Sequence, residues 1–167
     1  MFSECPQFWE EWEGHCYLFS PEDTWYTWSA AQTACRARNS SSDLPSVTSD
    51  REEMFIRNNT LGSTFWLGGF RLVPSCLLSK YSIKVLMEFD RKYAAPYKTP
   101  SSWMWSDGAA MNHTAWAPGQ PNNFWWGERC IRSVNTELGS GAGTWDDHKC
   151  WLKSANSLVC KMSVSNN

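Results

Sequence analysis

Seven cysteines constrain the fold of this 167-residue chain more than any other feature of its sequence. They lie at positions 5, 16, 35, 76, 130, 150 and 160, without the CxxC pairs of a zinc ribbon. Disulfide bonds are therefore the better interpretation, although the cysteines alone leave the pairing open. Three N-glycosylation sequons, which begin at Asn39, Asn58 and Asn112, also favour a secreted glycoprotein. The sequence thus predicts an oxidising, extracellular location.

We expect a single domain over residues 1–167, because this length supports one hydrophobic core and is short for two. The net charge of -2 lacks the basic excess that phosphate binding requires, so nucleic acid is not an expected partner. No run approaches the roughly 18 to 20 apolar residues that cross a bilayer, and we expect no membrane insertion. The N-terminus lacks a signal-peptide pattern, so a signal, if the chain is secreted, has been removed or replaced.

The first part of the chain predicts a hairpin followed by two helices. Residues 5–19 have the pattern of two short strands with a turn near Gly14. Residues 27–38 are rich in alanine and carry apolar side chains at helical spacing, which predicts a helix that buries Cys35. Residues 49–52 form a capping box, in which the serine and glutamate side chains each accept from the other's backbone N–H, so a second helix should begin there.

Short strand-like pieces follow, separated by Gly, Pro, Asn and Asp, and this order of helices and then strands indicates an α+β fold. Residues 71–100 fit poorly, because they carry six Lys or Arg residues against two acidic ones, and we interpret them as an insertion. Cys76 lies in this insertion and is either a free thiol or part of an interchain bridge. The strand-like pieces are residues 65–70, 102–105, 128–134, 143–145 and 157–161.

Oxygen-bearing side chains are concentrated in two segments of the last third of the chain. Five hard oxygen donors, three of them carboxylates, suit Ca2+, which takes roughly six to eight oxygens and tolerates irregular geometry. The carboxylates repel one another without a cation, and a bound cation would neutralise them. Pro121, if its peptide bond is cis, would turn the flanking side chains to one side. The candidate calcium ligands are Gln120, Asn122, Glu128, Asp146 and Asp147.

Several spaced motifs resemble the C-type lectin-like domain family, in the order in which that family carries them. They are residues 66–69 (WLGG), 103–108 (WMWSDG), 116–122 (WAPGQPN), 128–130 (ERC) and 145–147 (WDD). The resemblance implies the C-type lectin-like fold, with two helices, antiparallel sheets and a long irregular loop region that binds calcium and sugar. It also implies three disulfide bonds, which are Cys5–Cys16, Cys35–Cys160 and Cys130–Cys150.

In this family the loop calcium ion binds two neighbouring sugar hydroxyls directly. The Gln120-Pro121-Asn122 motif is a hybrid of the family's Glu-Pro-Asn form, typical of mannose-type ligands, and its Gln-Pro-Asp form, typical of galactose-type ligands. Its two amides can donate hydrogen bonds, whereas Glu128 and Asp146, which replaces the family's usual asparagine, only accept when ionised. This arrangement resembles galactose-type lectins. Mannose- or fucose-type binding and calcium-independent protein binding remain the alternatives.

Aromatic side chains complete the predicted sugar site. Phe124 stands where galactose-binding relatives often carry a ring, which can stack on the C–H face of the sugar. Asn123 and Arg129 occupy places where some relatives carry acids for a second calcium ion, so we expect no second ion. The predicted carbohydrate-binding residues are Gln120, Asn122, Phe124, Trp125, Trp126, Glu128 and Asp146.

The expected partners are glycans, and galactose or N-acetylgalactosamine is favoured. One monosaccharide in a shallow site binds weakly, so useful binding needs several copies, and we expect a homo-oligomer with Cys76 as a candidate bridge. The chain has no Gly-rich phosphate loop or nucleophile elbow, so we do not expect an enzyme. The resemblance to lectins suggests a role in innate immune recognition.

Overall fold

A computed structural model describes residues 5–60, 62–71, 103–124, 127–135 and 144–164 of the chain. The predicted insertion lies outside the described residues except for Arg71, and so does Cys76. The two predicted sugar-binding residues Trp125 and Trp126 also lie outside them. Within the described residues, neither helix is long and apolar enough to cross a membrane.

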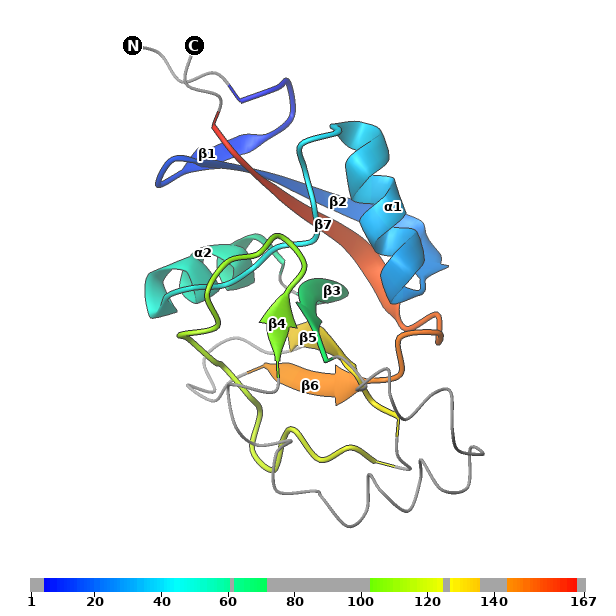
Figure 1. Cartoon of the computed structure of the whole chain (residues 1–167). Coiled ribbons are helices and arrows are strands. Elements are labelled where there is room, and N and C mark those ends of the chain that lie inside the picture. The colour runs from blue at the N-terminus through cyan, green and yellow to red at the C-terminus, as the bar shows by residue number, and fades with distance from the viewer. Residues whose placement is uncertain (1–4, 61, 72–102, 125–126, 136–143, 165–167) are drawn as a thin grey trace.

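The described residues form two helices and seven strands, as expected for an α+β fold (Figure 1). The strands make one sheet in the order β1-β2-β7-β3-β5-β6, and β4 pairs with β3. Its pairings are antiparallel except for one parallel contact between β3 and β7, so the sheet is mixed. The elements are β1 (Glu10–Trp12), β2 (His15–Tyr26), α1 (Trp28–Arg38), α2 (Asp50–Asn59), β3 (Ser63–Phe70), β4 (Met104–Trp105), β5 (Cys130–Asn135), β6 (Trp145–His148) and β7 (Ala155–Ser163).

The N-terminal hairpin and the first helix agree with the sequence. The hairpin turns at Glu13 and Gly14, which both have positive φ angles, of 43° and 76°. Strand β2 then pairs antiparallel along β7, which brings the start of β2 beside the end of β7 (Figure 1). Helix α1 packs beside these strands, and its Cys35 is fully buried and bonded to Cys160 of β7. The Cys5–Cys16 and Cys130–Cys150 bonds are also present, which confirms the implied pairing.

Helix α2 begins as predicted, but the capping box is only half formed. The Ser49 hydroxyl accepts from the backbone N–H of Glu52 at 3.2 Å. The Glu52 carboxylate accepts from the backbone N–H of Thr48 at 2.8 Å instead of from Ser49, so the reciprocal half of the prediction is wrong. The reason is that this carboxylate is buried, where it also accepts from the Tyr17 hydroxyl and the Lys161 ammonium. Burial favours a higher pKa for Glu52, but the bonds from Lys161 and Tyr17 outweigh burial and keep this pKa below its usual value.

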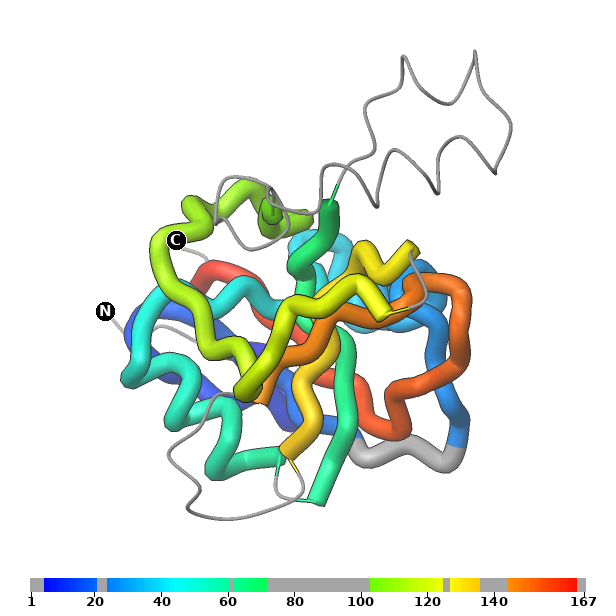
Figure 2. Tube along the Cα trace, turned by 90° about the horizontal axis from the view of Figure 1, so that it is seen from below, coloured from blue at the N-terminus to red at the C-terminus, as the bar shows by residue number. Residues whose placement is uncertain are grey.

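Tryptophan rings fill much of the core below the segment that leads to the candidate site. The Trp145 ring is fully buried and makes edge contacts with Trp105 and Trp116, at centroid distances of 5.5 and 5.8 Å. Trp116 in turn packs against Trp103 at 5.2 Å. The segment from residue 103 to residue 124 runs along the outside of the sheet and passes beside β6 (Figure 2). Its rings therefore anchor this irregular segment to the sheet.

Candidate functional site

The loop that carries the predicted ligands is attached to the start of β6. The backbone N–H of Ala117 donates to the carbonyl of Trp145 at 2.9 Å, and the Trp145 N–H donates to the carbonyl of Ala115 at 3.0 Å. Beyond this attachment, the peptide bond between Gln120 and Pro121 is cis. The chain then enters β5, which pairs antiparallel with β6. The loop and β6 thus form one local unit.

Asp147 holds the loop through its carboxylate. One of its oxygens accepts from the backbone N–H of Asn122 at 2.8 Å, and the other accepts from that of Asn123 at 2.7 Å. The side chain is buried, with 2% of its surface exposed. Two charge-assisted hydrogen bonds in a buried place are strong interactions, so Asp147 fixes the backbone of this loop against β6.

Glu128 closes the same loop from its other end. Its Oε2 accepts from the backbone N–H of Phe124 at 2.6 Å, and the Asn122 Oδ1 accepts from the same N–H at 2.7 Å. The Asn123 Oδ1 accepts from the N–H groups of Gly127 and Glu128 at 3.0 and 3.2 Å. Three predicted ligands, Asn122, Glu128 and Asp147, therefore surround one tight turn.

Asp146 lies on the other face of β6, and its carboxylate pairs with Arg132. The prediction ended the strand at residue 145, whereas β6 runs from Trp145 to His148. Successive side chains of a strand point to opposite faces, so Asp146 turns away from Asp147. Its two oxygens accept from the Arg132 guanidinium, with 3.1 Å from Nε to Oδ1, and the two residues are cross-strand neighbours. Arg132 is not among the residues predicted for the site, because only the strand register reveals the pair.

Gln120, two residues before Asn122 in the sequence, has an unsatisfied side-chain oxygen. Its Oε1 is buried, and no group in the described part of the chain donates a hydrogen bond to it. A buried carbonyl oxygen without a donor costs free energy, and such atoms are uncommon in folded proteins. Coordination of a cation would satisfy this oxygen.

Burial disfavours the charged forms of Glu128 and Asp147. Burial, together with repulsion from Asp147 and Asp146, raises the pKa of Glu128 to about 7, although the Phe124 N–H and Lys149 oppose this shift. Burial also raises the pKa of Asp147, against the hydrogen bonds from the loop backbone. A divalent cation bound at this place would favour the charged form of both carboxylates and so oppose both shifts.

The donor set suits calcium better than a transition metal. In the described residues, no three His, Cys, Asp or Glu side chains are grouped so that they could hold a metal ion. The predicted set, however, also depends on the amide oxygens of Gln120 and Asn122. Calcium accepts such neutral oxygens together with carboxylates, whereas zinc and copper prefer imidazole and thiolate. The residues present therefore fit calcium by their chemistry.

Glu53 of α2 supports the start of β6, a role that the sequence patterns did not predict. Its carboxylate is buried and accepts from the Trp145 indole N–H at 2.9 Å and from the Thr144 hydroxyl at 3.1 Å. Burial raises the pKa of Glu53, although both hydrogen bonds favour the charged form. Because Trp145 directly precedes Asp146 and Asp147, Glu53 fixes the start of the strand that carries them.

Comparison with known proteins supports the family resemblance. No protein-family model matches the chain. Human C-type lectin domain family 4 member G is 32% identical over 146 residues, which are 87% of this chain and 39% of that protein. The chain thus spans well under half the length of this curated relative.

Two solved structures cover nearly the whole chain. The C-type lectin CEL-I from Cucumaria echinata is 25% identical, with a TM-score of 0.66 over 97% of this chain and 99% of that one. A Ca2+-dependent type II antifreeze protein in its Ca2+-free form is 26% identical, with a TM-score of 0.64 over 95% of this chain and 100% of that one. The names of these relatives describe lectins and an antifreeze protein, not enzymes. With the disulfides, the two helices and the mixed sheet, they show that the chain belongs to the C-type lectin-like domain family.

Proposed function

We propose that this domain is a calcium-dependent lectin that binds glycans of the galactose type. The observation that carries the proposal is the convergence of Asn122, Glu128 and Asp147 on one turn. Gln120, two residues before this turn in the sequence, has a buried side-chain oxygen that accepts no hydrogen bond from the described residues. A bound calcium ion would neutralise the carboxylates and offer coordination positions to two neighbouring sugar hydroxyls. The similarity to two lectins supports this reading.

The protein's own side chains would then orient the sugar. The amides of Gln120 and Asn122 can donate to sugar oxygens, whereas the Glu128 carboxylate can only accept from sugar hydroxyls. Asn122 and Phe124 are exposed, so both can reach a ligand in solution. Asp146 can join this set only if it exchanges Arg132 for the ion, because both of its oxygens are bonded to that guanidinium.

Affinity chromatography tests the proposal directly. The protein should be retained on immobilised galactose in the presence of calcium and released by a chelator. Retention on mannose resin instead would favour a mannose- or fucose-type lectin. A glycan array with and without calcium that shows no bound sugar would contradict the proposal and favour a protein-binding domain.

Replacing Gln120 with glutamate should shift the preference toward mannose. The change removes an amide donor and adds an acceptor, so the balance of donors and acceptors moves toward the family's Glu-Pro-Asn form. The measurement is competition by galactose and mannose for binding to a mixed glycan surface. The control is Gln7→Glu, which changes an exposed amide in the turn before β1 and should leave the competition profile unchanged. An unaltered profile for Gln120→Glu would contradict the donor–acceptor argument.

Calcium affinity should decrease as the pH falls below about 7, by about tenfold per pH unit where one proton competes with the ion. The sign follows from Glu128, whose pKa is raised to about 7 and whose charged form is the one that binds a cation. Above this pH the affinity should level off. Isothermal titration calorimetry from pH 8 to pH 6, at constant ionic strength, measures the effect. A constant affinity over this range would contradict the assignment of Glu128 as a ligand.

We also propose an extracellular location, because three disulfide bonds persist in oxidising compartments. Weak binding of single sugars makes a homo-oligomer the expected functional form. A role in innate immune recognition would follow if the bound glycans are microbial.

A further inference from the structure

An exposed tryptophan lies against the candidate sugar-binding loop. Trp151 follows the disulfide-bonded Cys150, and 62% of its surface is exposed. Its six-membered ring covers Gly127, since a Cβ atom at that glycine would lie 3.2 Å from the ring's Cη2 and 3.9 Å from its Cζ3. The ring therefore rests directly on the loop backbone and presents much of its surface to solvent.

Gly127 joins this ring to the candidate site. Its φ angle is +95°, in the left-handed region that favours glycine, and a side chain here would also push the Trp151 ring away. Its N–H donates to the Asn123 Oδ1 at 3.0 Å, and the next residue is the predicted ligand Glu128. The tryptophan surface is thus continuous with the turn that gathers the oxygen donors.

The turn that carries Trp151 is held on several sides. The N–H of Leu152 donates to the carbonyl of Lys149 at 3.1 Å, which closes the turn. The carbonyl of Cys150 accepts from the backbone N–H of Trp28 at the start of α1, at 3.0 Å. The Cys130–Cys150 bond fixes the turn to β5. A ring presented by such a turn loses little freedom when it binds a ligand.

We propose that Trp151 forms a second saccharide subsite, which binds the sugar unit linked to the one held at the predicted calcium site. This inference rests on the proposed function. A pyranose ring has a face of C–H groups that packs well on an indole ring, while its hydroxyls remain in water. We take the ligand to be an oligosaccharide because the Trp151 ring adjoins the loop that carries the oxygen donors. The exposed surface of one indole ring is too small for a typical protein–protein interface.

The test compares Trp151→Ala with the wild-type domain, using methyl β-galactoside, lactose and N-acetyllactosamine in calcium and measuring affinity by calorimetry. Wild-type protein should bind at least one disaccharide about three- to tenfold more tightly than the monosaccharide, the range expected for one stacking contact. Trp151→Ala should lose this advantage and keep its affinity for the monosaccharide. Trp151→Phe should retain part of it, because a smaller ring still stacks.

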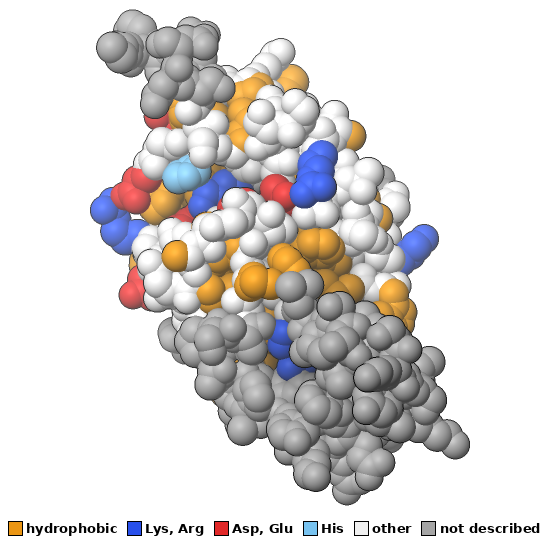
Figure 3. Space-filling model, viewed as in Figure 1, with side chains coloured by type: hydrophobic (Ala, Val, Ile, Leu, Met, Phe, Trp, Pro, Cys, Tyr) orange, Lys and Arg blue, Asp and Glu red, His pale blue; other side chains and the backbone are white. Residues whose placement is uncertain are grey.

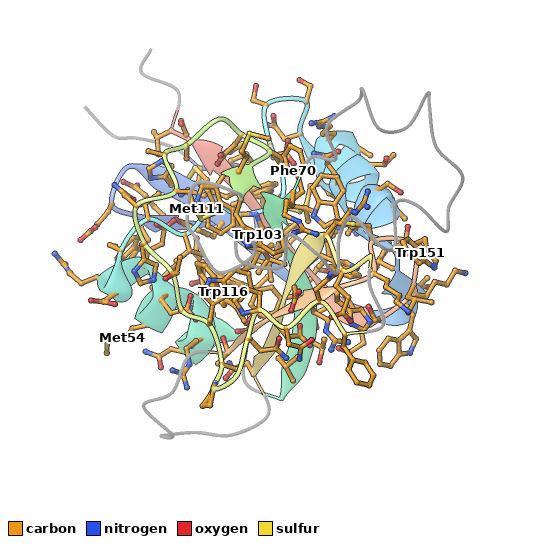
Figure 4. All side chains as sticks on the ribbon, turned by 60° about the horizontal axis from the view of Figure 1, so that its bottom comes forward. Met54, Phe70, Trp103, Met111, Trp116 and Trp151 are labelled. Atoms are coloured by element: carbon orange, nitrogen blue, oxygen red, sulfur yellow. A yellow bond between two sulfur atoms is a disulfide. The ribbon has the colours of Figure 1, made fainter. Side chains whose placement is uncertain are left out.

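Met54→Ala is the matched control. Met54 is also 62% exposed, and it lies on α2 at the opposite side of the molecule (Figure 4). Its removal should leave both affinities unchanged. Apolar side chains also reach the surface elsewhere, as the face in Figure 3 shows. The Met54 variant therefore tests whether loss of any exposed apolar side chain lowers the affinity for sugars.

Four outcomes would overturn the inference. The disaccharide advantage could persist in Trp151→Ala, or be absent from the wild type although the monosaccharide binds. If Trp151→Ala lost affinity equally for the monosaccharide and the disaccharides, Trp151 would contact the first sugar unit and not the second. A second set of titrations uses methyl α-mannoside and α-linked mannobiose. If the wild type binds none of the sugars in either set, the proposed function fails and the inference fails with it.

Discussion

Replacing Glu128 with glutamine is expected to lower the calcium affinity on the order of 100-fold and to abolish retention on sugar resin. Glutamine keeps the size of the side chain and an oxygen that accepts from the Phe124 N–H, which lies 2.6 Å from the carboxylate. It removes the charge that a cation would bind. The loss should therefore come from the ion and not from the loop backbone. Calorimetric titration with calcium and chromatography on galactose resin measure the two effects.

The control for this variant is Glu11→Gln, which removes an exposed carboxylate from β1. It changes the net charge equally and should leave calcium binding and sugar retention unchanged. Glu128→Ala and Asp147→Ala should also abolish retention, although Asp147→Ala frees two loop N–H groups as well. All of these variants should keep the disulfide-held fold, which circular dichroism can verify. Unchanged retention in the Glu128 and Asp147 variants would rule out this site.

Removal of the Cys35–Cys160 bond should lower the free energy of unfolding by about 5 kcal/mol in the chain-entropy model. The bond closes a loop with a sequence separation of 125 residues, so its loss frees most of the chain in the unfolded state. A typical domain is stable by roughly 5–15 kcal/mol, so this loss would remove between about a third and all of that stability. Urea unfolding of the Cys35→Ala/Cys160→Ala variant, in the presence of a chelator, measures the effect.

The Cys5–Cys16 bond provides the matched control, because its separation is only 11 residues. The double alanine variant of this pair should lose about 3 kcal/mol by the same relation. The difference between the two pairs tests the dependence on loop length. Equal losses would show that local packing around the cysteines, and not chain entropy, determines the stabilisation.

Local patterns in the sequence were sufficient for most of the secondary structure. The turn at Gly14, the alanine-rich helix around Cys35 and the serine cap of α2 depend on residues close together in the chain. Their backbone hydrogen bonds form within a few residues, so the sequence alone contains the cause. The family motifs added the three disulfide pairings, which the positions of the cysteines could not supply.

The buried carboxylates show what local patterns cannot predict. Glu52 and Glu53 stand in the first turn of α2, where a glutamate is usually exposed to solvent. Both are buried here because their hydrogen-bond donors come from distant elements. Glu52 accepts from Lys161, 109 residues away, and Glu53 accepts from Trp145, 92 residues away.

The sequence by itself indicated the candidate calcium ligands, since amide and carboxylate oxygens near a proline are visible in the chain. The tertiary structure decided how these groups are arranged. The register of β5 and β6 pairs Asp146 with Arg132 and turns Asp147 toward the loop, and the Cys150 turn places Trp151 on Gly127. The functional groups of a residue are known from the sequence. The groups that they contact depend on how strands far apart in the sequence pack together.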